Sequence, residues 1–171
     1  MRIIILGNAC AGKTTMARHL VSQSGDCQIP CLSLDFIAWN ANLEREPLEK
    51  SIRELRKFLQ ANDRWVMEGC YADLIEVALP DCTELHFLNP GEETCLAQCK
   101  SRSWEPERFA SAAEQQAMLP ALIDWVKEYE TRQDECGLSR HKLLYQNFTG
   151  RKREYQLVAD YPSSSRLTKQ G

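Results

Sequence analysis

The chain has 171 residues, which is enough for one domain with a sizeable hydrophobic core. Its formal net charge of −3 gives no sign of a nucleic-acid-binding surface, and no window approaches the roughly 18 apolar residues of a membrane span. The apolar run at residues 3–6 is too short for a signal peptide, and we interpret the eight cysteines mainly as reduced thiols. We therefore expect a cytoplasmic protein with neither a nucleic-acid partner nor a membrane anchor.

The N-terminal stretch MRIIILGNACAGKTT combines a predicted strand with a phosphate-binding loop. The loop fits G-x-x-x-x-G-K-[ST] at every fixed position, and its residues are Gly7, Asn8, Ala9, Cys10, Ala11, Gly12, Lys13 and Thr14. Glycines let the chain curl so that backbone N–H groups cradle phosphate oxygens. Lys13 would then reach the terminal phosphates, and the Thr14 hydroxyl would bind Mg²⁺. The alternative is a glycine-rich turn between a strand and a helix, without a ligand.

A helix predicted over residues 13–22 follows this loop, so its positive end would face the phosphates. Together with Thr15 in the first helical turn, the loop predicts a site for ATP. Cys10 lies within the loop, where oxidation of its thiol would block nucleotide entry.

Two further predicted strands end at acidic residues. Residues 31–34 are followed by Asp35, and residues 65–67 are followed by Glu68 and Gly69. Carboxylates at this edge of a parallel sheet point into the ligand crevice, although a helix cap is the alternative for Asp35. We expect Asp35 and Glu68 to hold the waters of the Mg²⁺ ion bound by Thr14. Asp35 would also accept the proton of an acceptor hydroxyl.

Residues close to Glu68 suggest little more chemistry. Gly69 would let a ligand approach the backbone closely. Tyr71 and Asp73 follow on a short helix or loop, and we interpret both as structural residues.

Apolar spacing predicts the remaining elements. Helices are expected at residues 48–60, 92–101, 112–133 and 138–148, with Pro120 kinking or interrupting the third of them. Strands are expected at 85–88 and 155–159, after an exposed basic run at 151–153. Because strands and helices alternate, the fold is predicted to be α/β with a mainly parallel sheet. Residues 1–162 would form one domain, and residues 163–171 a polar tail.

Between two of these helices the pattern breaks, at residues 103–111. The segment is polar and has the size of an active-site lid, here placed at about 102–111. Arg102 and Arg108 flank it, and Arg132 lies on a later helix. With Lys13, these arginines would supply positive charge over a transferring phosphoryl group. Solvated surface arginines are the alternative.

GNACAGKT, Asp35, the WVMEGCY stretch at 65–71 and the lid between two helices resemble the adenylate kinase and shikimate kinase group of small P-loop kinases. The resemblance covers roughly residues 1–160. It implies a five-stranded parallel sheet in the order 2-3-1-4-5, ATP and Mg²⁺ as cofactors, and arginines contributed by the lid and the helix after it. It departs from shikimate kinases at Glu68-Gly69-Cys70, where a glycine triplet is expected. It departs from adenylate kinases by lacking a long, arginine-rich lid.

The sequence therefore predicts ATP-dependent phosphoryl transfer to a small acceptor, either a nucleotide or nucleoside or a shikimate-like hydroxyl compound. The predicted catalytic residues are Lys13, Asp35, Arg102 and Arg132, and Arg108 is assigned to nucleotide binding. The alternative is a nucleotide-binding regulator or weak ATPase that changes conformation without an acceptor. The oligomeric state is left open.

Overall fold

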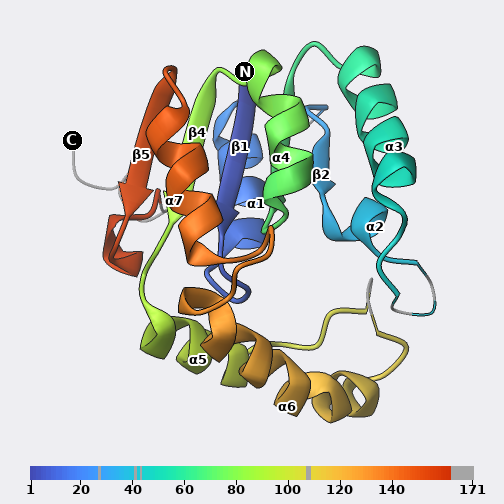
Figure 1. Cartoon of the computed structure of the whole chain (residues 1–171), viewed down its shortest axis with the longest axis vertical. Coiled ribbons are helices and arrows are strands. Elements are labelled where there is room, and N and C mark those ends of the chain that lie inside the picture. Colours follow the sequence, from blue (N-terminus) through green and yellow to red (C-terminus); the bar gives the residue numbers. More distant parts are fainter. Residues whose placement is uncertain (27, 41, 43, 107–108, 163–171) are drawn as a thin grey trace.

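The computed structural model describes residues 1–26, 28–40, 42, 44–106 and 109–162, and Figure 1 shows their arrangement. Five strands form one sheet in the order β2-β3-β1-β4-β5, and every neighbouring pair is parallel. The strands are β1 (Arg2–Gly7), β2 (Cys31–Ser33), β3 (Trp65–Gly69), β4 (Glu84–Leu88) and β5 (Arg151–Tyr155). The predicted α/β class and the strand order implied by the resemblance are both confirmed.

Helices cover both faces of this sheet. They are α1 (Lys13–Gln23), α2 (Asp35–Ala38), α3 (Leu48–Ala61), α4 (Ala72–Ala78), α5 (Glu92–Lys100), α6 (Ala112–Lys127) and α7 (Leu138–Asn147). In Figure 1, α1 lies behind the sheet, α4 and α7 lie in front of it, and α5 and α6 cross beyond the carboxyl ends of the strands. The strand ends that carry the predicted site residues therefore face α5, α6 and the segment between them.

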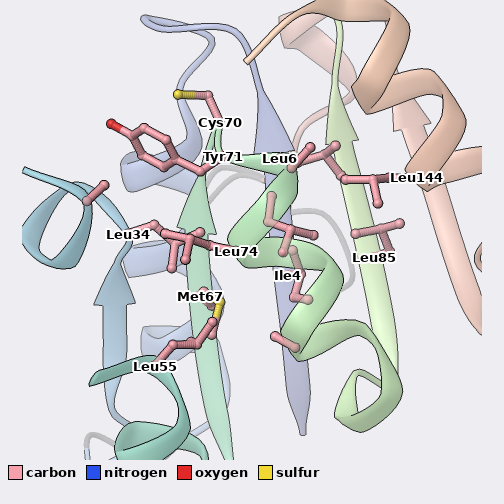
Figure 2. Close-up of a cluster of buried hydrophobic side chains, with 14 of the residues drawn as sticks. Ile4, Leu6, Leu34, Leu55, Met67, Cys70, Tyr71, Leu74, Leu85 and Leu144 are labelled. Atoms are coloured by element: carbon pink, nitrogen blue, oxygen red, sulfur yellow. The ribbon is translucent and has the colours of Figure 1, made fainter. Parts of the chain in front are cut away.

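The central strand β1 is buried on both sides. Successive strand residues point to opposite faces, so Ile4 and Leu6 join the core under α4 and α7, part of which Figure 2 shows. Ile3 and Ile5 join a second core on the α1 side. A continuous apolar run is what a parallel strand covered by helices on both faces requires.

Two boundaries differ from the sequence-based expectation. Helix α6 ends at Lys127 instead of residue 133, and Pro120 lies inside it without interrupting it. Residue 120 is exposed, so water can bind the carbonyl group that proline leaves without a helical partner. The chain after Lys127 continues as a short 3₁₀ turn, η2 (Glu128–Glu130).

The last strand is the second difference. Strand β5 is Arg151–Tyr155, and the predicted strand at 155–159 is wrong. As an edge strand, β5 exposes its charged side chains, which hides the apolar pattern used to find strands. Residues after it form a 3₁₀ turn, η3 (Val158–Asp160). Within the described ranges, no helix has the length and apolar character needed to cross a membrane.

Candidate active site

The phosphate loop joins β1 to α1 at the point where the strand order reverses, since β1 has β3 on one side and β4 on the other. Gly7 has a φ of 150°, and a Cβ atom there would lie 2.3 Å from the Leu88 carbonyl oxygen of β4. Gly12 has a φ of 93°, which other residues rarely adopt. Both glycines of the motif therefore have a backbone role in shaping the loop.

The loop holds its lysine inward. Lys13 is buried, and its Nζ donates a hydrogen bond to the Asn8 carbonyl oxygen at 2.8 Å. The Asn8 side chain accepts from the Ala9 backbone N–H at 2.7 Å and donates to the Val126 carbonyl oxygen of α6 at 3.0 Å. The ammonium group is thus held within the curl of the loop, and the loop is anchored to the helix that follows the lid.

A hydroxyl and a carboxylate lie side by side at the start of α1. Thr14 Oγ1 donates to Glu68 Oε1 at 3.0 Å, and Glu68 is buried at the carboxyl end of β3. Such oxygen donors suit Mg²⁺, which binds through few protein oxygens together with waters and phosphate oxygens. The residues present therefore fit a magnesium-bound nucleotide: the loop would hold the phosphates, and Thr14 and Glu68 would hold the ion. Thr15 lies exposed in the next position of α1.

Asp35 is held by a contact that the sequence did not indicate. It begins α2 after β2, and its Oδ1 accepts a 2.7 Å hydrogen bond from the Tyr71 hydroxyl. Figure 2 shows Tyr71 beyond the end of β3, with its hydroxyl directed away from the aliphatic core. A Cβ at Gly69 would lie 2.8 Å from the Leu34 Cβ, so packing against Leu34 by itself requires a glycine at this position.

Arg102 lies against the phosphate loop. Its guanidinium forms a two-pronged ion pair with Glu105, at 2.8 and 2.7 Å, and its Nη1 lies 4.0 Å from the Cys10 sulfur. Burial opposes the charge, but Glu105, Cys10 and Asp35 favour it more strongly, so the pKa of Arg102 is raised. Arg102 is therefore a permanent cation beside the loop.

Arg132 lies in a different environment. Its guanidinium carbon is 3.4 Å from the ring centroid of Trp125, and its Nη2 donates to Glu128 at 2.7 Å. The side chain is only 6% exposed, and Asp134 lies 3.7 Å from Nη1, beyond hydrogen-bonding distance. Arg102 is thus beside the loop, Arg132 is stacked on an α6 tryptophan, and Arg108 lies outside the described residues.

One further contact with the loop comes from the far end of the chain. The Tyr161 hydroxyl donates to the Ala11 carbonyl oxygen at 3.0 Å, and its ring would contact a side chain placed at Gly12. Sequence reasoning missed this residue because a single tyrosine after an edge strand carries no pattern. Tyr161 supports the loop from outside the motif.

Comparisons with known proteins describe only the fold. No family model and no curated protein matches the chain. A shikimate kinase from Bacteroides thetaiotaomicron is 16% identical over 85% of this chain and 97% of its own, with a TM-score of 0.48. YorR from Bacillus subtilis, in complex with phosphorylated GDP, is 12% identical over 90% and 84%, with a TM-score of 0.48.

An uncharacterised protein from Eubacterium ventriosum is 18% identical over 90% of this chain and 88% of its own, with a TM-score of 0.47. All three identities are below 20% and all three TM-scores are below 0.5, so these similarities say nothing about the activity of this chain.

Proposed function

We propose that this protein is an ATP- and Mg²⁺-dependent kinase that transfers a phosphoryl group to a small nucleotide, nucleoside or cyclic hydroxyl compound. The observation that carries the proposal is the Thr14–Glu68 hydrogen bond beside the buried Lys13, inside a complete phosphate-loop motif. Residues 7–15 would bind the ATP phosphates, and Thr14 and Glu68 would hold the ion directly or through water. Asp35 would hold further waters of the ion.

The remaining roles follow from charge and position. Phosphoryl transfer is catalysed mainly by placing the reactants and by stabilising charge on the transferring group. Arg102, which already touches the loop at Cys10, would supply this charge together with Lys13. Asp35 would accept the proton of the attacking hydroxyl. Arg132 would act from the acceptor side, since its cation is stacked on Trp125.

A nucleotide-binding regulator or weak ATPase is the second candidate, and one observation favours it. Glu105 and Glu128 neutralise Arg102 and Arg132 in this conformation, so neither cation is yet committed to a phosphate. A kinase must release Arg102 from Glu105 when the lid closes over both substrates.

An acceptor screen distinguishes the two functions. ADP release is measured with Mg·ATP and a panel of nucleosides, nucleoside monophosphates and cyclic polyols. For a kinase we expect one class to raise the rate at least about tenfold, and Arg102→Ala to lower that stimulated rate by about 10- to 100-fold while ATP affinity stays within about twofold. Arg151→Ala, on the exposed edge strand, is the matched control. Slow ADP release with every compound would contradict the kinase proposal and favour the regulator.

A further inference from the structure

A directed chain of hydrogen bonds lies behind Asp35. The Trp39 indole Nε1 donates to the Tyr71 hydroxyl oxygen, and the Tyr71 hydroxyl donates to Asp35 Oδ1 at 2.7 Å. An indole N–H can only donate, and an ionised carboxylate can only accept. The single hydroxyl hydrogen of Tyr71 is therefore committed to Asp35, and the direction of both bonds is determined.

The tyrosine is held in a state in which it donates. Tyr71 is 3% exposed, and burial, with the nearby Cys70 and Asp35, raises the pKa of its hydroxyl. It therefore stays protonated throughout the physiological pH range. Its ring is also covered by Arg45, whose guanidinium carbon lies 4.6 Å from the ring centroid and whose Nη2 pairs with Asp73 at 3.1 Å.

The chain of contacts continues to α6. Trp39 meets Trp125 edge to face, with ring centroids 6.5 Å apart and planes at 71°. Trp125 in turn carries the Arg132 guanidinium on its ring. Arg132 is thus connected to Asp35 through three aromatic rings, which come from α6, from the end of α2 and from the end of β3.

We propose that Tyr71 and Trp39 are positioning residues that orient the Asp35 carboxylate toward the attacking hydroxyl, with Trp125 and Arg132 supporting them from α6. The proposal rests on the proposed function, in which Asp35 is the base. A carboxylate on a short four-residue helix can rotate about its side-chain bonds, and a hydrogen bond from a buried hydroxyl restricts that rotation. Misplacing a catalytic group by about 1 Å can cost about 100-fold in rate.

The test uses ATP hydrolysis, in which water replaces the unidentified acceptor. The water oxygen forms a bond to the γ-phosphorus, the bond from that phosphorus to the bridging oxygen breaks, and its electron pair leaves with ADP. Asp35 takes the proton from the water and later releases it to solvent. The rate and the KM for ATP are measured for Tyr71→Phe, Asp35→Asn and the double variant.

We expect Tyr71→Phe to lower kcat about tenfold with the KM for ATP within about twofold, because the effect lies in orientation and not in binding. Asp35→Asn should lower kcat further, and the double variant should be no slower than Asp35→Asn alone. Such non-additivity marks residues that act as a unit. Trp39→Phe, which removes the indole N–H donor, should also lower kcat, by a smaller factor than Tyr71→Phe.

Three outcomes would overturn the proposal, and they differ in what else they contradict. If Tyr71→Phe lowers kcat by the same factor in the Asp35→Asn background as in the wild type, Tyr71 acts independently of Asp35, through the general structure. If Asp35→Asn slows hydrolysis but Tyr71→Phe and Trp39→Phe do not, only the positioning role is wrong. If Asp35→Asn has no effect, the base role in the proposed function is wrong as well. Tyr145→Phe on α7 is the matched control, and thermal unfolding of each variant checks the fold.

Discussion

The two halves of the candidate site are built in different ways. The phosphate side is a continuous loop, in which the Lys13 ammonium bonds to a carbonyl oxygen five residues earlier. The side proposed to bind the acceptor is assembled from side chains far apart in the chain: Asp35 and Tyr71 are separated by 36 positions, and Trp39 and Tyr71 by 32. Consecutive backbone N–H groups and one lysine can bind phosphate, whereas side chains from distant elements must be brought together to recognise a particular acceptor. The phosphate side can therefore be recognised from a sequence motif, and the acceptor side cannot.

The comparison predicts that the phosphate loop tolerates no side chain at Gly7. Gly7→Ala places a Cβ atom 2.3 Å from the Leu88 carbonyl oxygen, at a φ of 150°, and neither backbone can move without disturbing the β1–β4 pairing. We expect the free energy of unfolding to fall by about 4 kcal/mol or more in denaturant titrations.

Gly25→Ala is the matched control, since its φ is 69° but a Cβ atom there meets nothing within 4 Å. This change should cost only about 1 kcal/mol, the strain of the left-handed conformation. Equal losses in the two variants would show that contact with β4 does not constrain the loop.

A buried histidine near the site should make the fold sensitive to acid. His141 lies beneath Cys70, next to Tyr71, with its Nε2 bonded to the Cys70 carbonyl oxygen and its Nδ1 to the Tyr129 hydroxyl. Burial lowers the pKa of His141 to about 4. The unfolded chain then binds more protons between about pH 6.5 and pH 4, so the folded state loses stability as the pH falls through that window.

The loss attributable to His141 is about 3 kcal/mol, at 1.36 kcal/mol for each pH unit between the two pKa values. His141→Gln keeps a donor and an acceptor but does not titrate. Denaturant titrations from pH 7 to pH 4 should therefore give a flatter profile for this variant than for the wild type. Parallel profiles would contradict the assignment.

ATP binding on the phosphate side should depend strongly on the Lys13 cation. Lys13→Ala is expected to weaken ATP binding about 100-fold, or about 2.7 kcal/mol, because a buried charge in contact with phosphate is removed. The fold should survive, since the side chain makes one hydrogen bond to the loop. Calorimetric titration of ATP gives the affinity, and Lys142→Ala, at an exposed position of α7, is the control. Wild-type affinity in Lys13→Ala would contradict nucleotide binding by this loop.

The smallest expected effect concerns the metal. Glu68→Gln removes the carboxylate that accepts from Thr14 but keeps the side-chain length. We expect the Mg²⁺ concentration for half-maximal ADP release to rise about tenfold, the scale on which residues around a metal usually act. Glu49→Gln, exposed in the first turn of α3, should leave it unchanged. An unaltered Mg²⁺ requirement in Glu68→Gln would show that Glu68 does not hold the ion.

Several features could be predicted from sequence because each rests on local chemistry. The loop motif requires particular residues at adjacent positions, and the apolar run of β1 reflects a strand covered on both faces. The same logic located β3 and α3, whose apolar residues follow one strand or one helix face. The strand predicted at 155–159 is wrong because a charged edge strand such as β5 needs no apolar pattern, and Pro120 does not interrupt α6 because it is exposed to water.

What only the tertiary structure decided is the partner of each polar side chain. Asp35 follows β2 and Glu68 lies at the carboxyl end of β3, yet Glu68 accepts a hydrogen bond from Thr14 and Asp35 accepts one from Tyr71. Arg102 and Arg132 look alike in sequence, but one touches the loop and the other stacks on Trp125. The sequence alone predicted a phosphate-binding loop, because the motif occupies consecutive positions. The surroundings of the acceptor carboxylate depend on packing between distant elements, which no local pattern encodes.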